Sequence, residues 1–163
     1  MIQNNRFGIN SVLESIYVIG DFALRPDFSL TREGPIKPGD WTKAGYPFYS
    51  GEMCYKLDFS TDACVKKAEL VLGNLNGAAA IYVNGKKAST VAFPPFGADI
   101  TNFLELGDNQ LEVRVKNTLQ NLLGPHKAEG KGLVTPGSFY LEEAPNYFNP
   151  SGLWGDWQLK IYY

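Results

Sequence analysis

A chain of 163 residues is long enough to form one domain with its own core, and its 44% hydrophobic and 20% charged residues exclude general disorder. The net charge of -2 excludes the basic surface that nucleic acid requires, and no apolar run approaches the roughly 18 residues of a membrane span. Aromatic residues make up 13% of the chain, which also contains 17 Gly and 10 Pro, a composition typical of many short strands joined by turns.

Alternation of apolar and polar side chains predicts strands along most of the chain. Glu52–Phe59, Gln110–Asn117 and the stretch from Trp157 onward each place an apolar residue at every second position, as in an antiparallel strand with one face in water. Further strands are expected at Ser15–Phe22, Val65–Leu72, Ala78–Asn84, Lys86–Val91 and Ser138–Glu142. No segment carries a sustained helical period, so the predicted fold class is all-β, an antiparallel β-sandwich.

Turn chemistry supports these boundaries. Asn84-Gly85 stands between two predicted strands, and both residues tolerate the positive φ of a two-residue type I′ hairpin turn. Two long segments, Arg25–Gly51 and Leu123–Gly155, escape the alternation and carry prolines, glycines and interleaved aromatic residues. Long irregular segments of a domain are usually functional loops or covers for a sheet edge, so these two are the expected functional regions.

Residues that commonly perform catalysis are sparse. Hydrolysis by paired carboxyl groups, one a general acid and the other a nucleophile or base, needs the two about 5–10 Å apart, whereas the candidate carboxylates are scattered over predicted turns and wet strand faces: Asp40, Glu52, Asp99, Glu142, Glu143 and Asp156. We expect them to be solvated or to cap turns. With one histidine and no Asp-rich loop, no metal or other cofactor is expected. Cys54 and Cys64 are expected to be free, partly buried thiols, with a disulfide as the alternative.

Several motifs resemble those of a known group of modules. The chain reads Tyr-Val-Asn-Gly at 82–85, Phe-Gly-Ala-Asp-Ile-Thr at 96–101 and Gly-Asp-Asn-Gln-Leu at 107–111. This pattern resembles the galactose-binding-domain-like jelly roll that accompanies glycoside hydrolases of family 2. The segments 117–126 and 150–155 extend the resemblance to the C-terminal sandwich of bacterial glycosidases of the α-L-rhamnosidase-like kind.

The resemblance implies that residues 1–163 form a single jelly-roll domain from the C-terminal part of a larger bacterial glycosidase, acting in the periplasm or outside the cell. In that setting the module is a non-catalytic accessory domain, and its partners are carbohydrate and the catalytic domain of the same parent chain. Three functions stay open: a module that binds carbohydrate or contributes a loop to a neighbouring active site, a purely structural module, and a self-sufficient enzyme.

Carbohydrate sites combine aromatic faces, which stack on the apolar faces of sugars, with polar groups for the hydroxyls. The loop residues that could form such a site are Trp41, Tyr46, Tyr49, Asn121, His126 and Trp154. The aromatic rings would be platforms, and Asn121 and His126 would supply polar contacts. The alternative is that these rings pin the loops to the sandwich. Trp157 and Tyr82 lie in predicted strands and are expected in the core.

Overall fold

The computed structural model describes residues 17–124, 126 and 146–163. Its strands and two short helical turns follow one another along the chain as β1 (Ala23–Leu24), β2 (Leu30–Thr31), β3 (Gly39–Asp40), β4 (Glu52–Thr61), β5 (Lys67–Val71), β6 (Asn74–Asn76), β7 (Ala78–Val83), β8 (Lys86–Val91), β9 (Gly97–Asp99), η1 (Thr101–Phe103), β10 (Gly107–Lys116), α1 (Gln120–Leu123), β11 (Gly152–Trp154) and β12 (Gln158–Tyr162). No helix in these described residues is long and apolar enough to cross a membrane.

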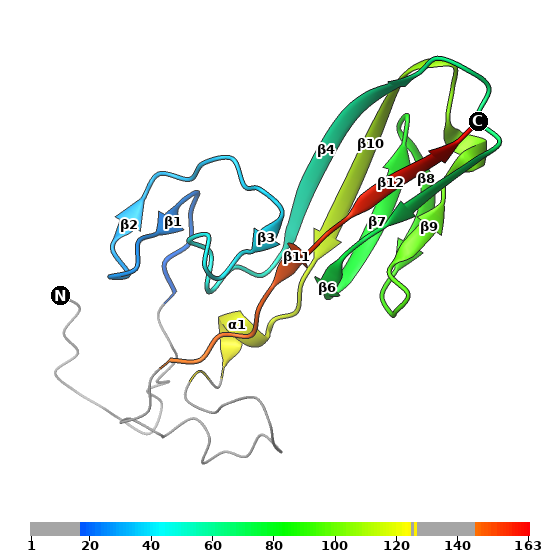
Figure 1. The fold of residues 1–163 in the computed structure, drawn as a ribbon. Coiled ribbons are helices and arrows are strands. Elements are labelled where there is room, and N and C mark those ends of the chain that lie inside the picture. Colours follow the sequence, from blue (N-terminus) through cyan, green and yellow to red (C-terminus); the bar gives the residue numbers. More distant parts are fainter. Residues whose placement is uncertain (1–16, 125, 127–145) are drawn as a thin grey trace, which may run out of the picture.

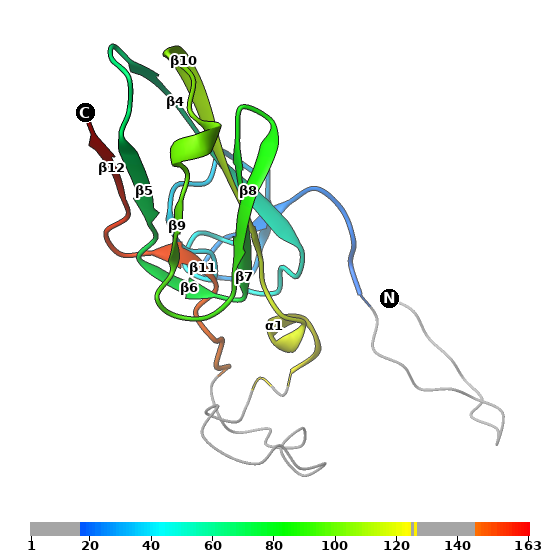
Figure 2. The ribbon, with the colours of Figure 1, turned by 90° about the vertical axis from the view of Figure 1, so that its right-hand side faces the viewer.

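Two antiparallel layers make up the sandwich (Figures 1 and 2). One is the four-stranded sheet β4-β10-β7-β8, in which the two longest strands pair over their whole length, from Gly107↔Thr61 to Lys116↔Glu52. The other consists of the three-stranded sheets β12-β5-β9 and β3-β11-β6. The all-β sandwich predicted from alternation is therefore confirmed.

A break divides the second layer into its two sheets. Strands β5 and β6 pair with β12 and β11 respectively, so a single ladder is interrupted where Gly73 and Gly155 separate the paired segments. A Cβ on Gly73 would clash with the carbonyl oxygen of Trp154, and Gly155 has a φ of 84°. Close backbone approach and a left-handed conformation both favour glycine, which explains why the ladder breaks here.

The alternating residues fill the space between the layers. Strand β10 buries Leu111, Val113 and Val115 completely, and β7 buries Ile81 and Val83 in the same way. The second layer adds inward-facing side chains, such as Leu70 of β5 and Leu153 of β11. The whole buried cluster comprises Trp41, Tyr55, Ala68, Leu70, Leu72, Leu75, Ala79, Ile81, Val83, Val91, Ile100, Leu111, Val113, Val115 and Leu153. Burial of this apolar surface is the main force that holds the layers together.

Turn predictions are confirmed where the structure describes them. Asn84 and Gly85 have φ angles of 51° and 76°, as a type I′ hairpin requires. The Asn84 side chain also donates to the carbonyl of Phe103 and accepts from the amide of Gln110, so the turn is fixed to its neighbours. Asp99 accepts from the amide of Thr101, whose hydroxyl in turn accepts from the amide of Ala68; polar side chains at a strand exit commonly bond to the backbone in this way.

Some strand and core predictions were wrong. Tyr17–Phe22, the described part of the expected strand Ser15–Phe22, forms no strand: Ile19 is 93% exposed, because no neighbouring strand pairs with it among the described residues. The expected strand Ser138–Glu142 lies outside the described residues. Tyr82 points to the outer face of its sheet and not into the core, whereas Trp157, just before β12, is partly buried and packs against the core. One turn of helix, α1, appears where no helix was expected.

Candidate functional site

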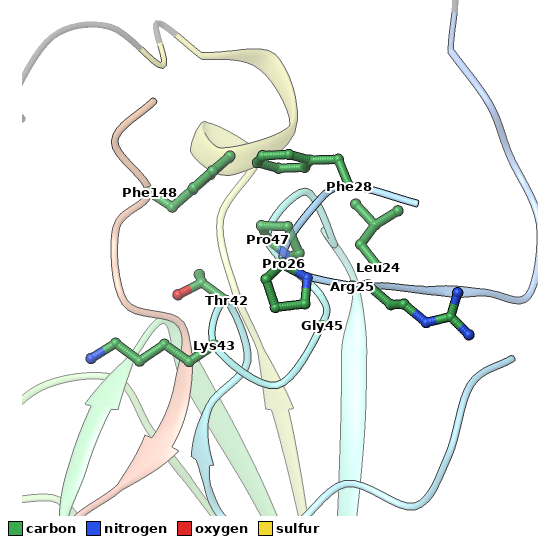
Figure 3. A pocket seen from close by; sticks show the side chains of 9 residues that line it. All are labelled: Leu24, Arg25, Pro26, Phe28, Thr42, Lys43, Gly45, Pro47 and Phe148. Atoms are coloured by element: carbon green, nitrogen blue, oxygen red, sulfur yellow. The ribbon is translucent and has the colours of Figure 1, made fainter. Parts of the chain in front are cut away.

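A hollow of about 340 Å³ lies between the two long loops (Figure 3). Nine residues line it: Leu24, Arg25, Pro26, Phe28, Thr42, Lys43, Gly45, Pro47 and Phe148. Eight of these come from the segment around Arg25–Gly51, and Phe148 comes from the second loop. The hollow therefore lies where the sequence placed the functional regions, and its walls are apolar and aromatic with a few polar groups, the mixture typical of small-molecule sites.

The first wall is the hairpin of β1 and β2. Its five-residue turn closes because the amide of Phe28 donates to the carbonyl of Arg25 at 2.8 Å, and the amide of Arg25 donates to the carbonyl of Ser29 at 3.0 Å. Pro26 presets the turn geometry. The Asp27 carboxylate accepts from the hydroxyl and the amide of Ser29, and these two bonds lower the pKa of Asp27.

The second wall is the turn that follows β3. The Asp40 carboxylate accepts from the amide and hydroxyl of Thr42 and from the amide of Ser151, so it ties this turn to β11. Gly45, with a φ of 97°, accepts a hydrogen bond from the amide of Leu24 at 2.8 Å. A Cβ there would lie only 3.0 Å from the carbonyl oxygen of Leu24, so glycine permits the close approach of the two walls.

An aromatic cluster forms the third side of the hollow. The ring of Phe48 packs edge-on against the rings of Phe148 and His126, with 4.9 Å and 5.4 Å between ring centroids. Its centroid lies 6.1 Å from that of the Phe28 ring. His126 Nε2 lies 2.7 Å from the carbonyl oxygen of Asn121. Since that oxygen can only accept, Nε2 carries the proton of this bond. The imidazole is thereby oriented by α1 and pressed against the two phenylalanine rings.

Asn121 joins the two ends of the second loop. It is 4% exposed, donates to the carbonyl of Asn149 at 2.8 Å, and accepts from the amide of Asn149 at 3.0 Å. Its amide also donates to the hydroxyl of Ser151 at 3.2 Å. These bonds to Asn149 and Ser151 make Asn121 a structural joint that places Phe148 beside the hollow.

The aromatic residues expected to be platforms lie elsewhere. Trp41 is completely buried and donates from Nε1 to the hydroxyl of Tyr55 at 2.6 Å. Tyr49 packs edge-on against both Trp41 and Tyr46, and its hydroxyl donates to the carbonyl of Glu52 at 2.7 Å. Burial raises the pKa of Tyr49. These three rings pin the first loop to the sandwich, which was the alternative that the sequence left open.

Of the six predicted residues, none lines the hollow, although His126 touches its aromatic side. Trp154 is partly buried in β11, where it pairs with Asn74. The residues that sequence reasoning missed are Phe28 and Phe148. For Phe28 the sequence did contain a signal. In Arg25-Pro26-Asp27-Phe28-Ser29 the Pro-Asp pair marks a turn, and the position after such a pair commonly takes a left-handed conformation that favours glycine or asparagine. A phenylalanine at that position is unusual.

The charges around the hollow are unevenly distributed. Arg25 and Lys43 are exposed and extend from opposite sides of it in Figure 3, and neither forms an ion pair with any described residue. No carboxylate is among the nine described lining residues; the nearest along the chain, Asp27 and Asp40, accept hydrogen bonds from Ser29 and Thr42 and keep their negative charge. Arg25 and Lys43 are therefore the charged groups among the described lining residues.

A polar hollow of about 580 Å³ lies at the other end of the long strands, lined by Asp58, Phe59, Ser60, Asn84, Asp108, Asn109 and Gln110. Its polar groups largely satisfy one another. Gln110 donates to Asp58 at 3.0 Å, and Asn109 donates to the carbonyls of Glu105 and Gly107 while it accepts from the amide of Glu105. These contacts fasten the turn before β10, so this hollow is a weaker candidate for a ligand.

A charged network covers the outer face of the four-stranded sheet. Glu112 accepts from the Cys54 thiol at 2.9 Å and from Arg114 at 2.9 Å, and Lys56 lies 3.5 Å away. These hydrogen bonds lower the pKa of Glu112 to about 2. Arg114 also lies over the ring of Tyr82, 4.6 Å from its centre, a cation–π contact that explains the outward position of this tyrosine.

Both cysteines are free, as expected, but they are exposed and not partly buried. The Cys54 sulfur nevertheless lies against its neighbours on the sheet. Loss of water around the sulfur, and then the hydrogen bond to Glu112, raises the pKa of the Cys54 thiol to about 11. A thiol that stays protonated at neutral pH is a poor nucleophile, so the network gives Cys54 no catalytic character.

Comparison with known proteins places these features among parts of glycosidases. No family model matches the chain. The rhamnosidase from Novosphingobium sp. PP1Y is 32% identical, with a TM-score of 0.54 over 69% of this chain. A protein of Formosa agariphila whose name assigns it as a beta-glucuronidase is 35% identical over 88 residues, 51% of this chain.

A β-glucuronidase from Ruminococcus gnavus is 29% identical over 43% of this chain, but its TM-score of 0.39 is too low to inform the fold. The chain spans only a small share of all these relatives: 11% of the rhamnosidase chain, 8% of the Formosa protein and 13% of the Ruminococcus enzyme. It is thus similar to a small part of large glycoside hydrolases.

Proposed function

We propose that this chain is a non-catalytic accessory module of a glycoside hydrolase, of the galactose-binding-domain-like jelly-roll kind. In this proposal the module binds carbohydrate at the hollow between its two loops, or presents these loops to a neighbouring active site. The observation that carries the proposal is the hollow itself, since two loops from distant parts of the chain build one aromatic-walled site. The similarity to about a tenth of the rhamnosidase chain supports an accessory role.

The role of His126 follows from its position in this proposal. Asn121 and the two phenylalanines hold its ring at the edge of the hollow. Among the described residues Nε2 bonds to the carbonyl of Asn121, and in this proposal the other ring nitrogen, Nδ1, accepts a hydrogen bond from a sugar hydroxyl. Trp41, by contrast, is enclosed by the core, and we assign it to stability and not to ligand contact.

A titration followed by NMR chemical shifts tests the proposal. Tryptophan fluorescence would be a poor probe, because none of the three tryptophans lines the hollow. We expect rhamnose- or uronate-containing oligosaccharides at millimolar concentration to shift the amide resonances of Phe28, Thr42 and Phe148, while those of Asn109 and Gln110 in the polar hollow stay unchanged. The absence of any response at the hollow across such a panel would contradict autonomous carbohydrate binding.

A second function is a purely structural module that packs on a catalytic domain. Its supporting observation is a set of strongly exposed apolar side chains: Phe93 is 82% exposed, Leu106 75%, Leu119 57% and Leu123 54%. Exposed apolar groups of this size favour burial against a partner surface. If sugars leave the hollow unchanged, and Phe93→Ser weakens association with a separately produced catalytic domain of a parent glycosidase, the structural function is supported.

A further inference from the structure

Phe28 adopts a conformation that a phenylalanine rarely takes. Two non-glycine residues among those described have positive φ, Asn84 at 51° and Phe28 at 61°. Asparagine is common in the left-handed region, and the Asn84 side chain stabilises this conformation through its hydrogen bonds with Phe103, Asn109 and Gln110. For a bulky side chain the same conformation is an outlier that costs free energy, and such residues cluster at functional sites.

The Phe28 ring does little for the fold. Its residue is 49% exposed, and its one ring contact among the described aromatic residues is Phe48, at 6.1 Å and a tilted angle of 46°. The hairpin turn closes through backbone bonds and Asp27, none of which needs a ring at position 28. A strained residue with a half-exposed ring that faces a hollow is suited to contact a ligand.

The lining adds two further requirements for the ligand. Its apolar parts favour a molecule with a flat C–H face, which an aromatic ring can stack on. Arg25 and Lys43 stand at opposite sides of the hollow without ion-pair partners among the described residues, and the nearby Asp27 and Asp40 accept hydrogen bonds from Ser29 and Thr42 and are not among the lining residues. Exposed guanidinium and ammonium groups, with no carboxylate among the described lining residues, are complementary to negatively charged groups on the ligand.

We infer that the hollow binds an acidic oligosaccharide, with one sugar ring stacked on Phe28 and the carboxylates of uronic acid units reaching Arg25 and Lys43. This inference rests on the proposed function, and it names the ligand class and the residues that select it. Because the two cations extend from opposite sides of the hollow, a chain of several units can reach both. Phe28 supplies shape recognition, and the two cations supply the preference for charge.

Matched ligands test the charge preference. The probes are uronic acid oligosaccharides (oligogalacturonate, alginate and hyaluronan fragments), the methyl-esterified oligogalacturonate, and neutral rhamnose oligosaccharides. We expect an acidic probe to bind at least tenfold more tightly than its neutral or esterified counterpart at low salt, with an affinity that falls as salt is raised. The double variant Arg25→Gln/Lys43→Gln should lose both the preference and the salt dependence. Equal binding of acidic and neutral probes would overturn the inference and leave carbohydrate binding by the module standing. No binding of any probe would overturn both the inference and autonomous carbohydrate binding.

Variants at Phe28 test the stacking. Phe28→Gly should weaken binding of the acidic probe about tenfold without lowering the melting temperature, because glycine takes positive φ without steric cost. Phe28→Leu keeps an apolar side chain but removes the ring, and it should also weaken binding; Phe28→Tyr should restore it. If Phe28→Gly binds as well as the original chain, the ring does not contact the ligand and the inference is overturned. The inference is also overturned if Phe28→Gly melts several degrees lower while Phe28→Leu binds normally, because the ring is then a packing anchor.

Discussion

Substitution of Tyr55 by phenylalanine should destabilise the sandwich well beyond the loss of one exposed hydroxyl. The Tyr55 oxygen accepts the indole N–H of Trp41 at 2.6 Å, and Trp41 has no exposed surface. Burial raises the pKa of Tyr55, although its hydrogen bonds with Trp41 and with the backbone of Leu153 act to lower it. The net rise agrees with an enclosed hydroxyl. Without the oxygen, the N–H stays buried with no acceptor, and a group left in this state costs about 1–3 kcal/mol.

Urea unfolding followed by tryptophan fluorescence measures this cost directly. We expect the midpoint to fall with little change in the slope, and the melting temperature to drop by roughly 3–8 °C, since a domain of this size shifts about 2–4 °C per kcal/mol. Tyr82→Phe is the matched control: its ring lies on the outer sheet face, and removal of its hydroxyl should change stability by no more than about 0.5 kcal/mol. Equal effects of the two substitutions would refute the role assigned to the Trp41–Tyr55 bond.

Three other sites give sharp expectations. Gly152→Ala should cost at least about 3 kcal/mol and shift the melting temperature accordingly, because φ is 107° and the new methyl group would clash with the Trp41 indole; a change below about 1 kcal/mol would contradict this packing. Stability should fall as pH drops from about 4.5 toward 2, because the folded-state pKa of Glu112 is lowered to about 2. At 1.36 kcal/mol per pH unit the full loss of stability is about 3.4 kcal/mol, and screening at the sheet surface reduces it to about 1–2 kcal/mol. Glu112→Gln should remove that part of the acid sensitivity. At pH 8 a thiol reagent should modify Cys64 faster than Cys54, whose pKa is raised to about 11, and equal rates measured by mass spectrometry would contradict the bond to Glu112.

The strands were predictable because their side chains alternate and their turns carry distinctive residues. In β10 every apolar residue is buried, and Asn84-Gly85 adopts the expected turn. Alternation describes only the chain itself, however, and it cannot show whether a partner strand lies alongside. Tyr17–Phe22 has apolar residues of the right kind, yet it remains outside the sheets because no described strand pairs with it.

The candidate site was predictable as a region and not as a set of residues. Composition identified the two loops, and the hollow lies between them. Which aromatic residue enters the core depends on distant partners: Trp41 is buried because Tyr55, 14 residues away, accepts its N–H. Preference for the larger aromatic residues therefore favoured Trp41 and overlooked Phe28, whose exposure follows from the backbone conformation of a five-residue turn.

The pairing of Asn121 with Asn149 has a consequence for how such a module could diversify. These residues are 28 positions apart, and their hydrogen bonds close the second loop at its base, next to the sandwich. Once a loop is closed in this way, doubling its length costs only about 0.6 kcal/mol in chain entropy. The segment between the two asparagines can thus be lengthened, shortened or exchanged while the layers stay folded, which makes this joint a natural place to graft a new recognition loop.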